Sequence, residues 1–182
     1  MKELQLKLLY SIIVAGKSAK FAENVIEKLF SYSEMEPFLI LKDWDRYNIL
    51  EIKLRAARTG NYNKTAQCIR ELITSNINLS TCTPEDLENI HGIGPKTARF
   101  FLLWTRPDSN YAALDVHILR WLRSLGYKAP KQTPSGKKYK KLENIFLKEA
   151  KKRNMTPAKL DYMIWEEGSG YTGWSPDNYK KG

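Results

Sequence analysis

The twelve residues LENIHGIGPKTA, at positions 87–98, decide how this sequence folds. Two glycines, Gly92 and Gly94, flank one apolar residue, and glycine lets a backbone turn tightly and approach a ligand without a Cβ atom in the way. Pro95 suits the first position of a following helix. The N–H groups of the turn then come to a helix N-terminus, which attracts phosphate. The sequence therefore predicts a hairpin between two helices.

Both flanking helices have signals of their own. Residues 83–86, Thr-Pro-Glu-Asp, supply an N-cap, a proline at the first helical position and an acid three residues after the cap. Downstream, side chains of one helical face recur from Ala98 to Thr105. We therefore expect a helix-hairpin-helix unit at about 84–105. Its candidate phosphate-binding residues are Gly92, Ile93, Gly94, Lys96 and Thr97.

Two later residues narrow the interpretation. A Gly-x-Gly turn alone fits a plain turn as well as a phosphate site, but Lys96 lies two residues after it and Asp115 follows in the segment ALDVHILR, 113–120. This combination resembles the helix-hairpin-helix DNA glycosylases, the superfamily of endonuclease III and the 8-oxoguanine glycosylases. Residues 58–66 also resemble the family's loop that presses into duplex DNA. Residues 160–165 are similar to a C-terminal segment of compact archaeal 8-oxoguanine glycosylases.

The resemblance implies roles for Lys96 and Asp115. Lys96 would attack C1′ of the deoxyribose and form an imine, which implies lyase activity, and Asp115 would stabilise positive charge on the sugar. A lysine amine is mostly protonated at neutral pH, so desolvation or a nearby cation must activate it. Without the motif, Lys96 would be an exposed helix residue and Asp115 an N-cap for residues 116–125, although Asp115 can serve both purposes. His117 is expected to support the site by orienting this loop.

Further site residues come from the same resemblance. Extruding a base leaves a gap in the duplex that a side chain must fill. Asn61 and Tyr62 stand where relatives place this wedge, although a core position for Tyr62 stays open. Residues 15–18 depart from endonuclease III relatives, which have a glutamine there that probes DNA beside the lesion. Weaker candidates for the base pocket are Trp165, Tyr171 and Trp174.

Three functions are consistent with these residues. The C-terminal resemblance favours a bifunctional DNA glycosylase and AP lyase of base excision repair that removes 8-oxoguanine from double-stranded DNA. An enzyme for oxidised or modified pyrimidines, similar to endonuclease III, is the first alternative. The second comes from another class, because helix-hairpin-helix units also serve as non-catalytic DNA-binding modules. Strand cleavage at an abasic site that depends on Lys96 would separate the enzymes from the module.

The fold class expected from the whole sequence is all-α. Apolar residues recur with helical spacing, and no period-two pattern is long enough for a sheet. The resemblance implies a helical lobe at 21–125 and a second lobe made of 1–20 plus 126–182, with DNA in the cleft between them. Residues 137–153 predict a helix with one apolar stripe and lysines on its other faces, which either are solvated or contact phosphate.

Composition limits the partners and cofactors. Thirty Lys and Arg against 20 Asp and Glu give a net charge of +10, which fits nucleic acid or a merely basic surface. The two cysteines, Cys68 and Cys82, are too few for an iron–sulfur cluster. No cofactor is therefore expected, except Na⁺ or K⁺ that the family implies at the carbonyls of Ile90, Gly92 and Ile93.

The sequence also gives expectations for localisation and assembly. No apolar run reaches the roughly 18 residues that span a bilayer, and no signal-peptide pattern is present at the N-terminus. We therefore expect a monomer that acts inside the cell, in the cytoplasm or nucleoid, and is neither secreted nor bound to a membrane.

Overall fold

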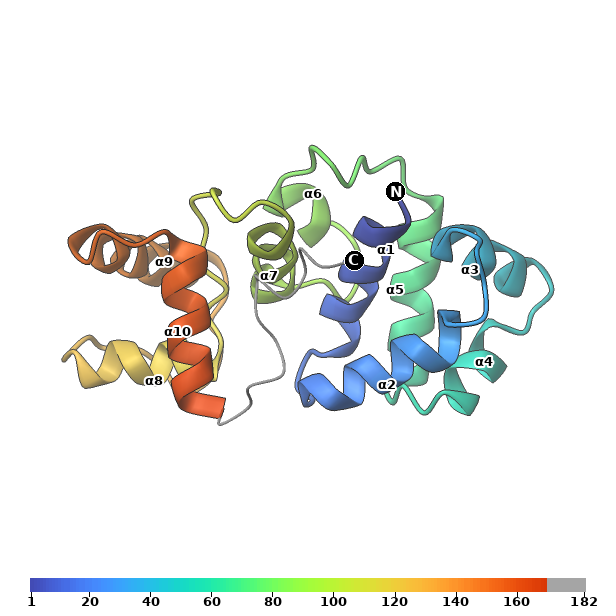
Figure 1. The fold of residues 1–182 in the computed structure, drawn as a ribbon, viewed down its shortest axis with the longest axis horizontal. Coiled ribbons are helices and arrows are strands. Elements are labelled where there is room, and N and C mark those ends of the chain that lie inside the picture. The colour runs from blue at the N-terminus through green and yellow to red at the C-terminus, as the bar shows by residue number, and fades with distance from the viewer. Residues whose placement is uncertain (170–182) are drawn as a thin grey trace. The chain divides into compact units, whose positions relative to one another are not determined.

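The computed structural model describes residues 1–169, and every regular element in that range is a helix, so the all-α fold class is confirmed (Figure 1). The helices are α1 (Lys2–Ile13), α2 (Ala19–Phe30), α3 (Pro37–Arg46), α4 (Leu50–Ala56), α5 (Tyr62–Thr74), α6 (Pro84–Glu88), α7 (Pro95–Thr105), α8 (Val116–Ser124), α9 (Gly136–Lys152) and α10 (Pro157–Ser169). Among these residues, none of the helices has the length and apolar composition needed to cross a lipid bilayer.

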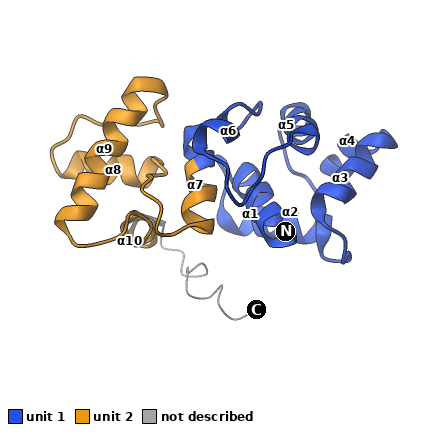
Figure 2. Cartoon of the chain, turned by 90° about the horizontal axis from the view of Figure 1, so that it is seen from above, with its two compact units in different colours: residues 1–98 blue, residues 99–182 orange. Residues whose placement is uncertain are grey.

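The chain divides into two compact units, residues 1–98 and 99–182, drawn in blue and orange in Figure 2. The division falls within α7, after Ala98. It differs from the boundaries that we expected at residues 21 and 125. The lobe made of 1–20 plus 126–182, and the DNA cleft, stay predictions.

Helices α1 to α5 build the core of unit 1. α1 packs on α2 and α3, and α5 packs on α3 and α4. The chain breaks between α3 and α4, so Trp44, Tyr47 and Leu50 do not lie on one helix. α3 ends at Arg46, Asn48 takes a left-handed conformation with φ 57°, and α4 begins at Leu50. Asparagine tolerates this conformation better than most residues, which lets the chain change direction between the two helices.

An arginine of α5 links the two helices that this turn separates. The Arg70 guanidinium donates to Asp45 of α3 at 2.7 Å and to Glu51 of α4 at 2.6 Å. The hydrogen bond from Arg70 lowers the pKa of Glu51. Other residues of α5, Cys68 and Glu71, contact the hairpin and are described below.

Helices α8, α9 and α10 build the core of unit 2. α10 packs on both α8 and α9. The apolar stripe predicted for 137–153 is present, since Tyr139, Leu142, Phe146 and Ala150 are buried and Ile145 is partly buried. Each large apolar side chain buried in this way contributes roughly 1.5–3 kcal/mol. The same cluster includes Ala112 and Leu114, so the chain just before Asp115 is part of the core.

Candidate functional site

The start of α6 has the predicted cap. The Thr83 hydroxyl accepts from the N–H of Asp86 at 3.2 Å, and the Asp86 carboxylate accepts from the N–H of Thr83 at 2.8 Å. These two bonds form a capping box. The hydrogen bond from the main chain of Thr83 lowers the pKa of Asp86. The first half of the helix-hairpin-helix unit therefore begins where the sequence indicated.

Two main-chain hydrogen bonds between residues three positions apart close the turns of the hairpin. The N–H of Ile90 donates to the carbonyl of Leu87 at 3.0 Å, and that of Ile93 donates to the carbonyl of Ile90 at 3.1 Å. Both isoleucine side chains are buried, whereas Gly92 and Gly94 are exposed. The hairpin is thus anchored by its apolar residues and presents its glycines to solvent.

The two glycines have different structural tasks. Gly92 has φ +87°, in the left-handed region that side chains rarely adopt. Gly94 does not have a positive φ, and a Cβ atom added there would meet nothing within 4 Å. The carbonyl of Gly94 accepts the N–H of Ala98 at 3.0 Å and so begins α7. The turn itself therefore requires glycine at position 92 only, while the main chain at Gly94 is exposed and has open space beside it.

Helix α5 supports the hairpin from within unit 1. The Glu71 carboxylate accepts the N–H of His91 at 2.6 Å, and this bond is the main cause of the lowered pKa of Glu71. A Cβ atom on Gly92 would lie 3.5 Å from the Cβ of Cys68. Burial raises the pKa of the Cys68 thiol to about 12, so this cysteine is a neutral packing group. The role of Glu71 could not be predicted from the motif, because it lies 20 residues upstream of His91.

Lys96 and Thr97 follow in the first turn of α7. Thr97 is buried, and Lys96 is partly exposed. Lys96 belongs to unit 1 together with the hairpin, and Asp115 belongs to unit 2. The meeting of these two side chains in one site stays a prediction.

Asp115 is the N-cap of α8. One of its carboxylate oxygens, Oδ1, accepts the N–H groups of both His117 and Ile118 at 2.9 Å. The other oxygen, Oδ2, makes no hydrogen bond to any residue of the described range 1–169. The carboxylate is partly exposed. Capping therefore fixes the orientation of the carboxylate and leaves one oxygen available, as required if Asp115 serves both purposes.

The segment that leads to Asp115 is held by two side chains of α9. The Tyr139 hydroxyl donates to the carbonyl of Ala112 at 2.7 Å and accepts the N–H of Leu114 at 3.1 Å. One turn later, Glu143 accepts the N–H of Ala112 at 3.1 Å and the Nε–H of Arg99 at 2.7 Å. All of these groups are buried. We call this set, Arg99, Ala112, Leu114, Tyr139 and Glu143, the Asp115 support.

The Asp115 support satisfies main-chain groups that no helix or sheet could pair. The Arg99 guanidinium also lies over the Tyr139 ring, 4.8 Å from its centroid, and burial strongly raises the pKa of the Tyr139 hydroxyl. Thr133 adds a hydrogen bond to the carbonyl of Leu114 at 2.9 Å. From the sequence, Tyr139 was expected in the apolar stripe, and the roles of Glu143 and Arg99 were missed. The one available signal was a glutamate four residues after that tyrosine, on the buried side of the helix.

His117 lies against helix α10. Its Nδ1 atom is buried and has no hydrogen-bond partner among the described residues. A Cβ atom on Gly168 would lie 2.4 Å from this nitrogen, so a glycine at this point lets α10 pass beside the imidazole. Trp165 of α10 is partly buried and packs on Tyr162, with ring centroids 6.4 Å apart. Tyr171 and Trp174, the other candidate pocket residues, lie outside the described residues.

The candidate wedge lies on a strongly bent loop before α5. Arg58, Gly60 and Asn61 have φ values of 59°, 67° and 46°, all in the left-handed region. Asn61 is exposed at the N-cap of α5. Tyr62 is half-buried, with the Arg55 guanidinium 4.7 Å from its ring centroid. Non-glycine residues in this conformation cost about 1–2 kcal/mol each, and such strain tends to gather at functional sites.

Lys17 holds this loop. Its amine donates a hydrogen bond to the carbonyl of the buried Thr59 and lies 4.7 Å from the centroid of the Phe21 ring. Burial lowers the pKa of Lys17. Lys17 lies in the segment 15–18, which differs from endonuclease III relatives. Its amine is thus bound to other residues of unit 1.

Comparison with known proteins identifies the family to which this chain belongs. Residues 1–155 match the model of the helix-hairpin-helix family described as 8-oxoguanine DNA glycosylase. The chain belongs to this family, because the match covers all helices from α1 to α9, including the hairpin between α6 and α7.

The individual proteins to which this chain is similar are also named as 8-oxoguanine DNA glycosylases. The chain is similar to an 8-oxoguanine DNA glycosylase/AP lyase of Thermoplasma acidophilum, with 36% identity over 84 residues, which are 46% of this chain and 40% of that protein. The match thus spans less than half the length of this curated relative. The solved 8-oxoguanine DNA glycosylase of Methanocaldococcus jannaschii has 28% identity and a TM-score of 0.71, over 94% of this chain and 80% of that one.

A second solved structure of the M. jannaschii protein contains nucleic acid. It is described as the 8-oxoguanine glycosylase/lyase in complex with 15mer DNA containing 8-oxoguanine. It has 26% identity to this chain and a TM-score of 0.67, and the likeness covers 93% of this chain and 82% of that one.

Proposed function

We propose that this chain is a bifunctional DNA glycosylase and AP lyase that excises 8-oxoguanine from double-stranded DNA. The observation that carries the proposal is the family match over residues 1–155, which contains the hairpin, Lys96 and Asp115. The DNA complex of the M. jannaschii relative supports damaged duplex DNA as the partner. The enzyme would act as a monomer inside the cell, in the cytoplasm or nucleoid where the DNA lies.

The hairpin is proposed to bind a DNA phosphate through its main chain. Gly92 and Gly94 are exposed, and α7 begins directly after them, so a phosphate there would also meet the positive end of the helix dipole. The N–H of Ile93 is engaged within the turn, so this residue would anchor the hairpin by its buried side chain. Lys96 and Thr97 complete the phosphate-binding set.

Lys96 is proposed as the nucleophile. Its neutral amine would form a bond to C1′ while the bond from C1′ to the base nitrogen breaks, and the base anion that leaves would take up the proton that the amine loses, relayed by Asp115. Opening of the sugar ring then gives an imine, and loss of a C2′ proton expels the 3′ phosphate by β-elimination. Asp115 would stabilise the positive charge on the sugar and accept the proton that the amine loses. The oxygen Oδ2, which the cap leaves available, suits this task.

The remaining site residues are proposed to hold the DNA around this reaction. Asn61 and Tyr62 would fill the gap in the duplex, from a loop whose backbone is already bent. His117 would keep the start of α8 in place through its packing against Gly168. Trp165, with Tyr171 and Trp174, would line the base pocket.

A monovalent cation at the hairpin is proposed on the chemistry of its donors. The carbonyls of Ile90, Gly92 and Ile93 offer neutral oxygen atoms, which suit Na⁺ or K⁺. The Ile90 carbonyl accepts one hydrogen bond, from Ile93, and a carbonyl has a second lone pair. When bound, the cation would supply positive charge beside the phosphate. No other cofactor is proposed.

Borohydride trapping tests the proposed reaction. Purified protein and the Lys96→Gln variant are incubated with duplexes that contain 8-oxoguanine, thymine glycol or an abasic site, and imines are reduced to stable adducts. We expect an adduct on the 8-oxoguanine and abasic duplexes with the wild type and none with Lys96→Gln. Preference for thymine glycol would favour the pyrimidine alternative. Tight binding without any adduct or base release would favour the non-catalytic module.

A further inference from the structure

Helix α9 has one continuous basic side. Its buried residues, Tyr139, Leu142, Phe146 and Ala150, lie on the side that faces the core of unit 2. Seven exposed lysines lie on the opposite side, within about 160° of arc at 100° per residue. We call these residues the lysine face; they are Lys137, Lys138, Lys140, Lys141, Lys148, Lys151 and Lys152.

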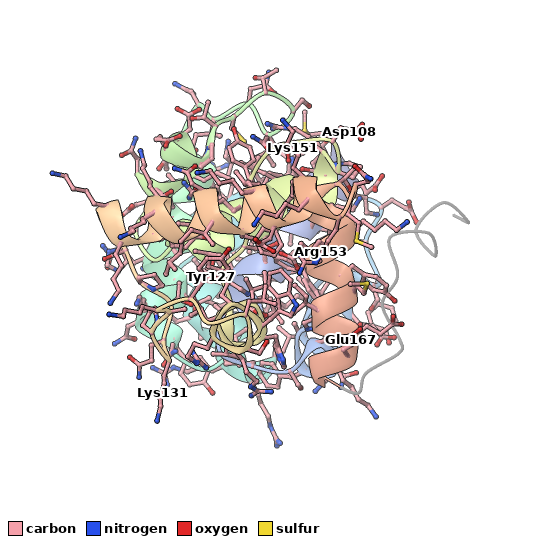
Figure 3. The ribbon with its side chains drawn as sticks, turned by 90° about the vertical axis from the view of Figure 1, so that its left-hand side faces the viewer. Asp108, Tyr127, Lys131, Lys151, Arg153 and Glu167 are labelled. Atoms are coloured by element: carbon pink, nitrogen blue, oxygen red, sulfur yellow. The ribbon has the colours of Figure 1, made fainter. Side chains whose placement is uncertain are left out.

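The acids of α9 leave most of this charge uncompensated. Glu143 is buried and engaged with Arg99. Glu149 accepts from Tyr127 at 2.8 Å and from Lys152 at 2.7 Å, and it also pairs with Arg153. Figure 3 looks onto this part of unit 2, with Lys151 and Arg153 on opposite sides of the end of α9.

Most of the lysine face takes part in no internal ion pair. Within the described range, five of its lysines form no ion pair with an acid; they are Lys137, Lys138, Lys141, Lys148 and Lys151. Their charge is therefore available to an external partner.

The lysine face stands on a fixed support. Phe146 packs edge-on against Trp121, with ring centroids 5.9 Å apart, and Arg153 lies over the same Trp121 ring at 5.0 Å. A helix of 17 residues is about 25 Å long, with successive turns about 5.4 Å apart. The helix therefore holds positive charges on one side at both of its ends, with four lysines at 137–141 and three at 148–152.

The beginning of the lysine face adjoins the Asp115 support. Tyr139 stands between Lys138 and Lys140 in the sequence, and its hydroxyl bonds to Ala112 and Leu114. The first turns of α9 thus both carry lysines of this face and, on their buried side, hold the segment that leads to Asp115.

We propose that the lysine face binds the phosphate backbone of duplex DNA beside the lesion. This inference rests on the proposed function and extends the DNA contact of unit 2 beyond Asp115. Duplex DNA presents a regular row of phosphates, and each lysine that neutralises one releases a counterion. A membrane surface is less suitable, because an interfacial helix inserts an apolar face, and that of α9 is buried in the core.

Salt-dependent binding tests the proposal with a matched control. The triple variant K137Q/K141Q/K148Q removes three charges from the lysine face. The control K20Q/K28Q/K42Q removes the same charge from exposed lysines of α2 and α3. Affinity for an undamaged duplex is measured over about 50–250 mM KCl, because the slope of log K against log salt falls by about 0.9 for each phosphate that the protein no longer neutralises.

We expect the slope to fall by about 2 to 3 for the α9 variant and to stay near the wild-type value for the control. Equal slopes for the two variants would overturn the proposal, and so would a difference seen with single-stranded RNA but not with the duplex. Circular dichroism establishes that both variants are folded. Borohydride trapping of the wild-type protein on an abasic duplex is run in parallel. Absence of an adduct there contradicts the proposed function, whereas equal salt slopes contradict only the role of the lysine face.

Discussion

In unit 1, the hairpin depends on its own main-chain hydrogen bonds, two buried isoleucines and one glutamate of α5. In unit 2, the segment before Asp115 makes three main-chain hydrogen bonds to two buried side chains of α9. The first arrangement lies mostly in consecutive residues, and its one distant partner, Glu71, is 20 positions from His91. The second joins residues that are 25 to 44 positions apart. A local motif can thus be recognised in a sequence, while an equally important support by distant side chains leaves almost no signature.

The largest effect, on base excision, is expected from a substitution that removes the charge of Asp115 but keeps its capping hydrogen bonds. In Asp115→Asn, the amide oxygen can still accept from His117 and Ile118, so stability should change by less than about 1 kcal/mol. Base excision under single-turnover conditions should fall by about 10²–10⁴-fold. Asp115→Ala, as a comparison, should lose activity and in addition about 0.5–2 kcal/mol of stability. Full activity in Asp115→Asn would show that only the cap matters.

The next largest effect should come from the Asp115 support. Glu143→Ala leaves the buried Arg99 charge without its carboxylate and should cost about 3–5 kcal/mol in urea unfolding. Tyr139→Phe leaves the Ala112 carbonyl and the Leu114 N–H unpaired, at about 1–3 kcal/mol. Destabilisation well below about 1 kcal/mol in both variants would mean that the Asp115 segment does not depend on these side chains of α9.

The two hairpin glycines provide a sharper comparison within unit 1. Gly92→Ala forces a side chain into a left-handed conformation and should cost about 1–2 kcal/mol of stability. Gly94→Ala has free space for its Cβ and should leave stability nearly unchanged while weakening duplex binding. Binding is measured by fluorescence anisotropy. If Gly94→Ala binds duplex DNA like the wild type, phosphate does not approach the hairpin at this point.

The smallest effect is expected from the pH dependence of Glu149. Hydrogen bonds from Lys152, Arg153 and Tyr127 lower its pKa to about 2. Because the folded value lies below the ordinary value, this stabilisation is present above about pH 4.5 and is lost as the pH falls towards 2. The effect should be modest, since the side chains of Lys152 and Arg153 are partly exposed. The difference in unfolding free energy between wild type and Glu149→Gln should therefore shrink from about pH 6 to about pH 3; a constant difference would contradict this assignment.

The helical periods and caps were predictable because they depend on neighbours within one or two turns. The start of α6 at Pro84, the start of α7 at Pro95 and the buried stripe of α9 follow from such local signals. The break between α3 and α4 has no comparably strong local signal, because Asn48 tolerates a left-handed conformation without requiring it. The division of the chain into two compact units at Ala98 has no local signal either, since no composition change marks it within the continuous helix α7.

For the candidate site, the sequence by itself determined the hairpin, Lys96 and the capping carboxylate of Asp115, because glycine, proline and an N-cap act on adjacent residues. Only the tertiary structure decided that Glu71 steadies the hairpin, that Lys17 holds the loop before α5 and that Tyr139 and Glu143 hold the Asp115 segment. These contacts satisfy buried or bent main chain, whose partners are set by the packing of helices and cannot be found from spacing along the chain.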